Sequence, residues 1–365
     1  MIAKRLAVAA IWLVLAVFAG ELLVRVFAPQ DLQHDIPDLW VMDPALGWRH
    51  RPNVHLVANT GQRDVEICTN AAGDRVDCHR PPRTQCAGHV LWLGDFEALS
   101  IPWDETPWAL LDADTGACTD AAGVGSYYMG QYVAAARERL GAPGAHWDVV
   151  TLAVYVANDY TTNPESVPPP QDVQRRPWRV FPAHLSVQGV WDWFYPFNSW
   201  LESHSQFYVA GRAAIRNSLD RSDTGIYGPP ETLLRSKLTP ELLDGTARGI
   251  ALVAQEAHRH GARFLVVVHP YRNQVLDPDG QKLARALPEL AGDLDMNAAQ
   301  ERLLERLVTV PEIDATVDLL PVFREHADPG LWEPVDQHLS AAAYKLWAGA
   351  VSPPLRELLA EAPPS

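Results

Sequence analysis

The sequence is poor in positive charge. It carries 30 lysine and arginine residues against 45 aspartate and glutamate residues, a formal net charge of -15. Phosphate backbones would repel a body this acidic, so nucleic-acid binding is excluded as its function. Internal repeats and low-complexity tracts are also missing, and no two cysteines have the short spacing of a zinc knuckle. A structural zinc site is therefore not expected.

What the sequence does contain is enough material for one large domain with appendages. The chain has 365 residues, of which 47% are hydrophobic and 21% are charged, values typical of globular proteins rather than disordered ones. Its 30 prolines and 13 tryptophans are high numbers. They indicate long ordered loops with aromatic anchors rather than a compact helical bundle.

Residues 1–28 have the pattern of a membrane-targeting segment. Lys4 and Arg5 precede an apolar run over residues 6–20, and further apolar residues extend it. We expect an uncleaved signal anchor, a single-pass inner-membrane transmembrane helix whose N-terminus stays cytoplasmic while the body is exported. The alternative is a cleaved signal peptide, since small residues around Ala19 would suit a peptidase.

The cysteines agree with an exported body. Cys68, Cys78, Cys86 and Cys118 are an even count within a stretch of about fifty residues, which predicts two disulfides in an oxidising compartment. The sequence leaves all three pairings open.

The rest of the chain divides into a lead-in and a larger domain. Residues 29–85 have proline, glycine and asparagine punctuation without a long helical period, which predicts loops and short strands. Over residues 86–362, apolar runs alternate with helical periods, except in an aromatic-rich insertion over residues 160–237. We expect the aromatic cluster at residues 191–200 to pack the inserted segment, or else to stack on a sugar or contact a membrane interface.

The strands of this domain are continuous apolar runs separated by helices. They are expected at residues 90–93, 117–118, 148–156, 263–268 and 315–320, with helices starting near 108 and over 127–140, 239–260 and 339–359. Runs of this kind predict a mainly parallel five-stranded sheet covered on both faces, that is, a three-layer α/β/α domain.

Ligands of such sheets bind outside the carboxyl ends of the strands. The polar residues and glycines that follow the expected strands are Asp95, Glu97, Gly123, Gly125, Asn158, Asp159, Asp336 and His338. A glycine turn with a free N–H, an asparagine amide and a histidine two residues from an aspartate are parts of an acyl-transfer site that lacks only its nucleophile.

These residues resemble the SGNH (GDSL) hydrolase superfamily over roughly residues 88–350. Its strand and Gly-Asp-Ser block looks like residues 90–96, its second-block glycine matches Gly125, and its third-block asparagine matches Asn158. Its last block, Asp and His before a helix, matches Asp336-Gln337-His338. The Asp-x-His spacing, residues 267–275 and the N-terminal helix are similar to membrane-associated bacterial branches that act in polysaccharide O-acetylation. The resemblance implies a flavodoxin-like three-layer fold.

The resemblance also implies roles for the site residues. His338 would be the general base and Asp336 would orient it. The Gly125 N–H and the Asn158 amide would be oxyanion donors. Neither a cofactor nor a metal is implied. The ligand would be an acylated small molecule, glycan or lipid of the cell envelope.

The sequence departs from the family at the nucleophile. Phe96 stands where the family has its serine, and a phenyl ring cannot form an acyl ester. The candidate substitutes are Ser100, a carboxylate of Asp95 or Glu97, or a water activated by His338. We therefore expect an SGNH hydrolase-like protein whose ancestral reaction, acyl ester hydrolysis or O-acyl transfer, is weakened or lost. The alternative is a catalytically inactive protein that binds a ligand or partner in the same pocket.

Overall fold

The computed structural model describes residues 2–28, 30, 32, 39–59, 63–83, 85–95, 98–170, 187–218, 229–333 and 338–361. Its centre is an eight-stranded sheet with the order β10-β9-β8-β6-β7-β5-β4-β3. The strands are β3 (His55–Asn59), β4 (Asp64–Thr69), β5 (Arg75–Val76), β6 (His89–Leu93), β7 (Cys118–Ala121), β8 (Val149–Tyr155), β9 (Arg263–His269) and β10 (Ala315–Asp318). A separate antiparallel pair is formed by β1 (Trp40–Asp43) and β2 (Gly47–His50).

Five neighbouring strands, β7, β6, β8, β9 and β10, run parallel. They fall where the sequence predicts strands, so the prediction of an α/β domain with a mainly parallel sheet is confirmed. The central strands β8 and β9 are buried over nearly their whole length, which explains why their sequences are continuous apolar runs rather than alternating ones.

The sheet is larger than the five strands expected. Strands β3, β4 and β5 come from the lead-in and continue the sheet in antiparallel fashion, with Cys68 opposite Val76 and Arg75 opposite Ala121. The lead-in thereby covers the edge of β7, which would otherwise present unpaired backbone groups to solvent. The strands β3, β4 and β5 of the lead-in are therefore part of the main sheet rather than a separate unit.

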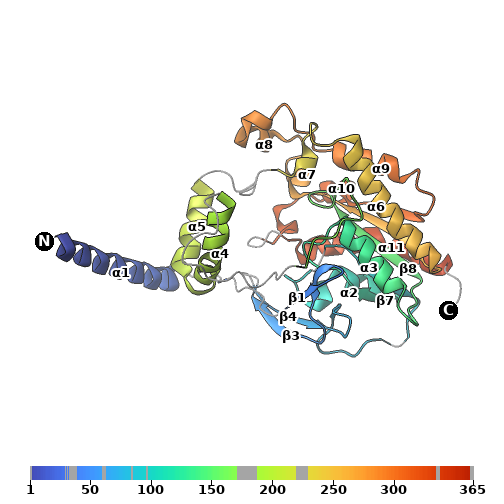
Figure 1. The fold of residues 1–365 in the computed structure, drawn as a ribbon, viewed down its shortest axis with the longest axis horizontal. Coiled ribbons are helices and arrows are strands. Elements are labelled where there is room, and N and C mark those ends of the chain that lie inside the picture. The colour runs from blue at the N-terminus through green and yellow to red at the C-terminus, as the bar shows by residue number, and fades with distance from the viewer. Residues whose placement is uncertain are drawn as a thin grey trace.

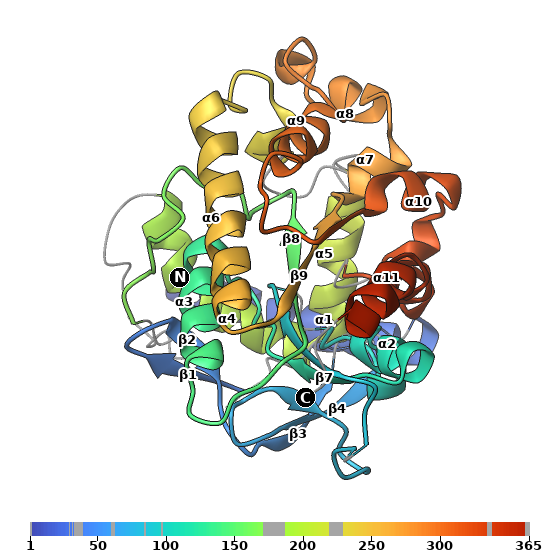
Figure 2. The same ribbon diagram turned by 90° about the vertical axis from the view of Figure 1, so that its right-hand side faces the viewer.

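Helices cover both faces of the sheet (Figure 2). On one face lie α3 (Met129–Leu140), α6 (Pro240–Arg259) and α9 (Ala298–Leu307), and on the other lie α2 (Pro107–Thr115), α10 (Leu319–Glu325) and α11 (Ala341–Glu361). Alternate residues of each strand supply the two cores. Trp92 of β6, for example, meets Trp347 of α11 edge to face, with ring centres 4.8 Å apart. Two short helices, α7 (Arg272–Leu276) and α8 (Gln281–Ala286), follow β9.

The N-terminal segment and the insertion form a second group of helices. In Figure 1, α1 (Ile2–Phe27) lies against α5 (Gln206–Ser218), which packs with α4 (Val187–His204). Within the described part of the chain, no helix combines the length and the apolar character needed to cross a membrane.

The aromatic cluster of the insertion is more exposed than expected. Trp193 and Trp200 of α4 are 39% and 50% exposed. These two residues do not form the packed core that the sequence suggests. The side chains of Trp191 and Tyr195 lie outside the described residues.

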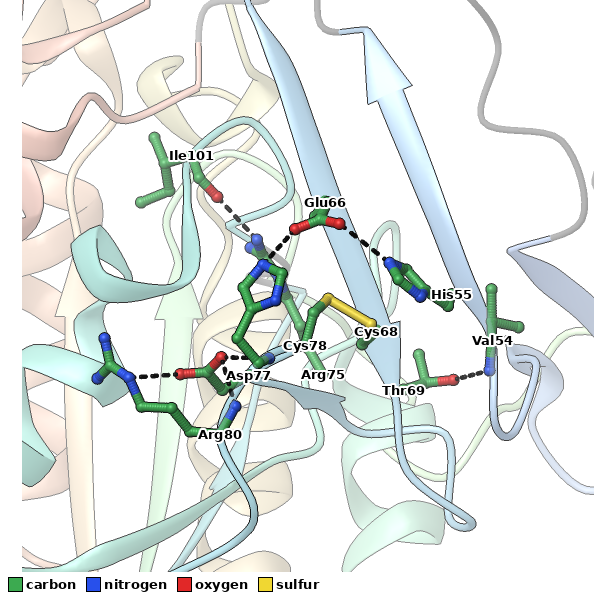
Figure 3. Close-up of a disulfide and its surroundings, with 11 residues drawn as sticks. Val54, His55, Glu66, Cys68, Thr69, Arg75, Asp77, Cys78, Arg80 and Ile101 are labelled. Atoms are coloured by element: carbon green, nitrogen blue, oxygen red, sulfur yellow. Dashed lines mark hydrogen bonds and ion pairs between the residues drawn. A yellow bond between two sulfur atoms is a disulfide. The ribbon is translucent and has the colours of Figure 1, made fainter.

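The chain has two disulfides, as the cysteine count predicts. Cys68 pairs with Cys78, and Cys86 pairs with Cys118. Figure 3 shows the first of these beside Glu66, whose carboxylate lies between two imidazoles, 3.1 Å from His55 and 2.5 Å from His79. The second links Cys86, at the start of the larger domain, to Cys118 of β7.

Candidate functional site

The carboxyl ends of β6, β8 and β9 form one edge of the sheet, which we call the carboxyl edge. Asp95 follows β6 and Asn158 follows β8, and the parallel pairing of these strands places the two residues side by side. The Asn158 Nδ2 donates a hydrogen bond of 2.9 Å to the Asp95 Oδ2. Asn158 is exposed and Asp95 is half-buried, so the pair is accessible to a ligand.

The glycine turn after β7 lies at the same edge. The Val124 N–H donates to the Gly94 carbonyl at 3.1 Å, and the indole Nε1–H of Trp48 donates to the Gly125 carbonyl at 3.1 Å. These bonds fix the peptide groups of the turn beside Asp95. Gly94 itself has a φ of +154°, and a Cβ there would come within 3.1 Å of Ala153. A residue with a side chain would therefore strain this close approach of β6 to β8.

A buried carboxyl that the sequence interpretation did not assign lies beneath Asn158. Asp159 is fully buried, and its oxygens lie 2.7 Å from the Tyr132 hydroxyl and 2.5 Å from the Tyr155 N–H. Burial raises the pKa of Asp159 well above its usual range, and the negative charge of Asp95 raises it further. A neutral Asp159 can donate to the Tyr132 hydroxyl, which in turn donates to the Tyr127 carbonyl at 2.9 Å.

This chain of hydrogen bonds fixes the backbone of the turn that carries Asn158, because Asp159 is the next residue. The sequence signal for it was weak, because an aspartate after a strand is common and Tyr132 is distant in the sequence. Asp159 is therefore a positioning residue in the site rather than a group that meets the ligand.

His338 lies on the segment that precedes α11. Its carbonyl accepts from the Glu333 N–H at 2.7 Å, and the neighbouring Leu339 pairs with Trp332. Glu333 in turn bonds Arg63 at 2.8 Å, and Arg63 lies 3.3 Å from Glu105, in the loop that follows β6. The exposed His338 is thus held on a segment that is linked to the β6 loop.

Phe96, Glu97 and Asp336 lie outside the described residues. The structure therefore brings together Asp95, Asn158 and the Gly125 turn, and it places His338 on the segment before α11.

Ser100, the candidate substitute nucleophile, is only 3% exposed. Its hydroxyl is buried and has no hydrogen-bond partner among the described residues. The loop around it is held by Arg75 of β5, which donates to the carbonyl of Ala98 and, at 2.7 Å, to that of Ile101. In this position the Ser100 hydroxyl cannot reach an ester in solvent.

Possible metal ligands cluster at one place in the described part of the chain. His55, Cys68 and Cys78 have ligand atoms within 4.8 Å of one another. Both sulfurs form the disulfide of Figure 3, so neither is a thiolate that could hold a cation. This cluster is interpreted as structural.

No protein-family model and no curated protein matches the chain. Among solved structures it is similar to TesA, with 14% identity and a TM-score of 0.35 over 74% of this chain and 99% of that one. It is similar to LAE5, an α/β hydrolase enzyme from the metagenome of Lake Arreo, Spain, with 11% identity and a TM-score of 0.36 over 75% and 97%. It is also similar to a catalytic mutant of Axe2, an acetylxylan esterase from Geobacillus stearothermophilus, with 12% identity and a TM-score of 0.34 over 75% and 94%.

Proposed function

We propose that the carboxyl edge binds the acyl group of a ligand, and that the protein is an SGNH hydrolase-like protein in which serine-dependent ester hydrolysis is weakened or lost. The observation that carries the proposal is the hydrogen bond between Asn158 and Asp95 beside the Gly125 turn. An amide held in this way at the ends of parallel strands is a preorganised donor for a carbonyl oxygen.

The proposed site has two donors for the ligand. An asparagine amide has two N–H groups, and the bond to Asp95 uses one of them and fixes the plane of the other. In the proposed site the second N–H and the Gly125 N–H face the ligand carbonyl. His338, oriented by Asp336, contributes an imidazole that accepts a proton from a hydroxyl or a water.

Phe96 decides between binding and turnover. The buried position of Ser100 argues against it as a displaced nucleophile, and Phe96 rather than a serine stands at the family's nucleophile position. Binding of an acylated glycan, lipid or small molecule without serine turnover is therefore the function we favour. A residual hydrolysis through a water activated by His338 is the second candidate, supported by the exposure of that residue.

Hydrolysis of p-nitrophenyl acetate tests the proposal. The native chain should show no more hydrolysis than Phe96→Ala, whereas Phe96→Ser should gain roughly 100-fold or more, because it restores a nucleophile beside a general base. The gain should vanish in Phe96→Ser combined with either His338→Ala or Asn158→Ala. If native protein turns over and His338→Ala abolishes this, the water mechanism holds. If Phe96→Ser gains nothing, the site is not of this type.

We further propose that α1 attaches the protein to the inner membrane and that the body is exported. The apolar side chains of Trp12, Phe18 and Phe27 are exposed on α1, and two disulfides fit an oxidising compartment. We expect the full chain to stay with membranes after alkaline carbonate extraction and its cysteines to resist alkylation in intact cells. Release by carbonate, or free thiols, would contradict attachment or export respectively.

A further inference from the structure

A cavity of about 670 Å³ opens between α7, α8, α10 and the short turn of helix at Pro329–Leu331. Figure 2 shows these three helices grouped beyond the end of β9. Its lining includes the charged residues Arg272, Asp277, Lys282 and Arg324. None of these residues belongs to the carboxyl-edge donors described above.

The cavity is positively charged in an acidic chain. Arg272, Lys282 and Arg324 line it, against the single acid Asp277, while the chain as a whole has a formal charge of -15. The Asp277 carboxylate is 7% exposed and already accepts the N–H groups of Lys282 and Leu283 at 2.9 and 3.0 Å. It is thus occupied by backbone donors. The carboxylates of Asp318, Glu301 and Asp279 also act on Arg324 but do not line the cavity, so the lining itself, with three cations and one acid, favours an anion.

Arg324 has unused hydrogen-bonding capacity. Its Nε donates to the Gln274 carbonyl at 2.8 Å, which fixes the guanidinium plane. Its Nη2 is buried and has no hydrogen-bond partner among the described residues. Burial also lowers the pKa of Arg324. A buried guanidinium N–H without a partner is costly. Because Nη2 is enclosed, an oxyanion in the cavity supplies the missing acceptor only when the Arg324 side chain turns toward the cavity.

Arg272 lines the cavity and also contacts Trp332, which pairs with the segment that carries His338. Its guanidinium carbon lies 5.9 Å from the centre of the Trp332 ring, and Trp332 pairs with Leu339, the residue after His338. Arg272 also follows the end of β9 by three residues, and that end pairs with Tyr155 of β8. The cavity therefore adjoins the carboxyl edge on its β9 side.

We propose that this cavity binds a compact oxyanion, the carboxylate or phosphate of a ligand, between Arg324, Arg272 and Lys282. Because the cavity adjoins the carboxyl edge, this anionic group would belong to the acylated ligand that binds there. This identification of the ligand rests on the proposed function. Anion binding by Arg324, Arg272 and Lys282 is inferred from the cavity lining and does not depend on the proposed function.

Titration of the full chain with inorganic phosphate and, separately, with acetate tests the proposal by calorimetry at low salt. We expect saturable binding of at least one anion at one site per chain. Arg324→Gln and Lys282→Gln should each weaken it about tenfold, because a charge-assisted hydrogen bond or a nearby charge is lost. Arg285→Gln removes the same charge from the same helix as Lys282, but outside the cavity lining, and should leave the affinity within about twofold.

The two anions separate a phosphate-bearing from a carboxylate-bearing ligand. Lys282 is exposed, so Lys282→Gln tests the site even where Arg324→Gln disturbs folding. Absence of saturable binding, or equal weakening by Arg285→Gln, would overturn the proposal. The titration is repeated in His338→Ala, where unchanged phosphate binding shows that the cavity is independent of the acyl site. Failure of the esterase test alone would thus leave the anion site standing.

Discussion

At the scale of single residues, Asp112 gives the chain a specific dependence of stability on pH. Its carboxylate lies between α2 and β7 and accepts from the Thr119 hydroxyl at 2.6 Å, but burial dominates and raises its pKa to about 6. The unfolded chain has the ordinary value of about 3.9, so the folded state binds this proton more tightly. The free energy of unfolding should therefore fall as pH rises from about 4 through about 6, by at most about 3 kcal/mol.

Urea unfolding at a series of pH values measures this slope. Asp112→Asn should flatten it, because the amide cannot ionise yet can still bond Thr119. Asp114 on the same helix is the comparison, since the guanidinium of Arg356, 2.6 Å from its carboxylate, lowers its pKa. Asp114→Asn should remove a contribution of the opposite sign. An unchanged slope in Asp112→Asn would show that another group carries it.

Arg75 should contribute strongly to stability because it is buried and holds the loop after β6. Its guanidinium donates to the carbonyls of Ala98 and Ile101. Arg75→Met keeps the apolar volume but leaves both carbonyls unpaired, and we expect a loss of about 2–4 kcal/mol in urea unfolding. Arg83 also donates to two carbonyls, at 3.2 Å each, but is exposed. Arg83→Met should cost less than about 1 kcal/mol, and equal losses would refute the role of burial.

The residues of the candidate site differ in how far the sequence could predict them. Asn158 could be chosen because it follows an apolar strand, and Gly125 because it lies in a glycine turn, and both features are visible in one sequence. The residues that hold the site in place could not be predicted in this way. Asp159 is bonded by Tyr132, and the loop after β6 is bonded by Arg75, and only tertiary packing brings these partners together. Whether Asp336 orients His338 stays a prediction.

At the scale of elements, the parallel strands were predictable and the antiparallel ones were not. A strand buried on both faces must be apolar throughout, so β8 and β9 are distinctive in the sequence. By contrast, β5 is two residues long and contains a buried arginine. Its membership in the sheet depends on pairing Arg75 with Ala121, a contact between segments far apart in the chain that no local pattern specifies.

The two disulfides should differ in how much they stabilise these elements. Cys86–Cys118 closes a loop with a sequence separation of 32 residues, and Cys68–Cys78 one of 10. Loop-closure entropy predicts about 3.7 and about 2.7 kcal/mol respectively at 25 °C. We expect the variant with serines at positions 86 and 118 to be less stable than the variant with serines at positions 68 and 78, by about 1 kcal/mol in urea unfolding. Each variant is the control for the other. The reverse order would show that native contacts, rather than chain entropy, set the difference.

At the scale of the whole molecule, the N-terminal helix is joined to the insertion by hydrogen bonds from α5. The Glu21 carboxylate accepts the N–H groups of Gln206 and Phe207 at 3.0 Å each and the Ser205 hydroxyl at 2.8 Å. The first N–H groups of a helix have no partner within it, so Glu21 acts as a cap supplied from a distant part of the chain. Gly20 lets the two helices approach, because a Cβ there would lie 2.9 Å from the Phe207 ring.

The cap predicts that α1 orders the start of α5. In the full chain, Glu21→Ala should speed amide hydrogen exchange at Gln206 and Phe207 about fivefold, since losing a cap costs about 1 kcal/mol. Exchange in α6 should not change, because its first turn is capped by its own Thr239 at 3.2 Å. Glu241→Ala, in that first turn, is the matched loss of an acid and should leave α5 unaffected. Unchanged exchange at Gln206 and Phe207 in Glu21→Ala would mean that packing against α1, rather than this carboxylate, holds the insertion.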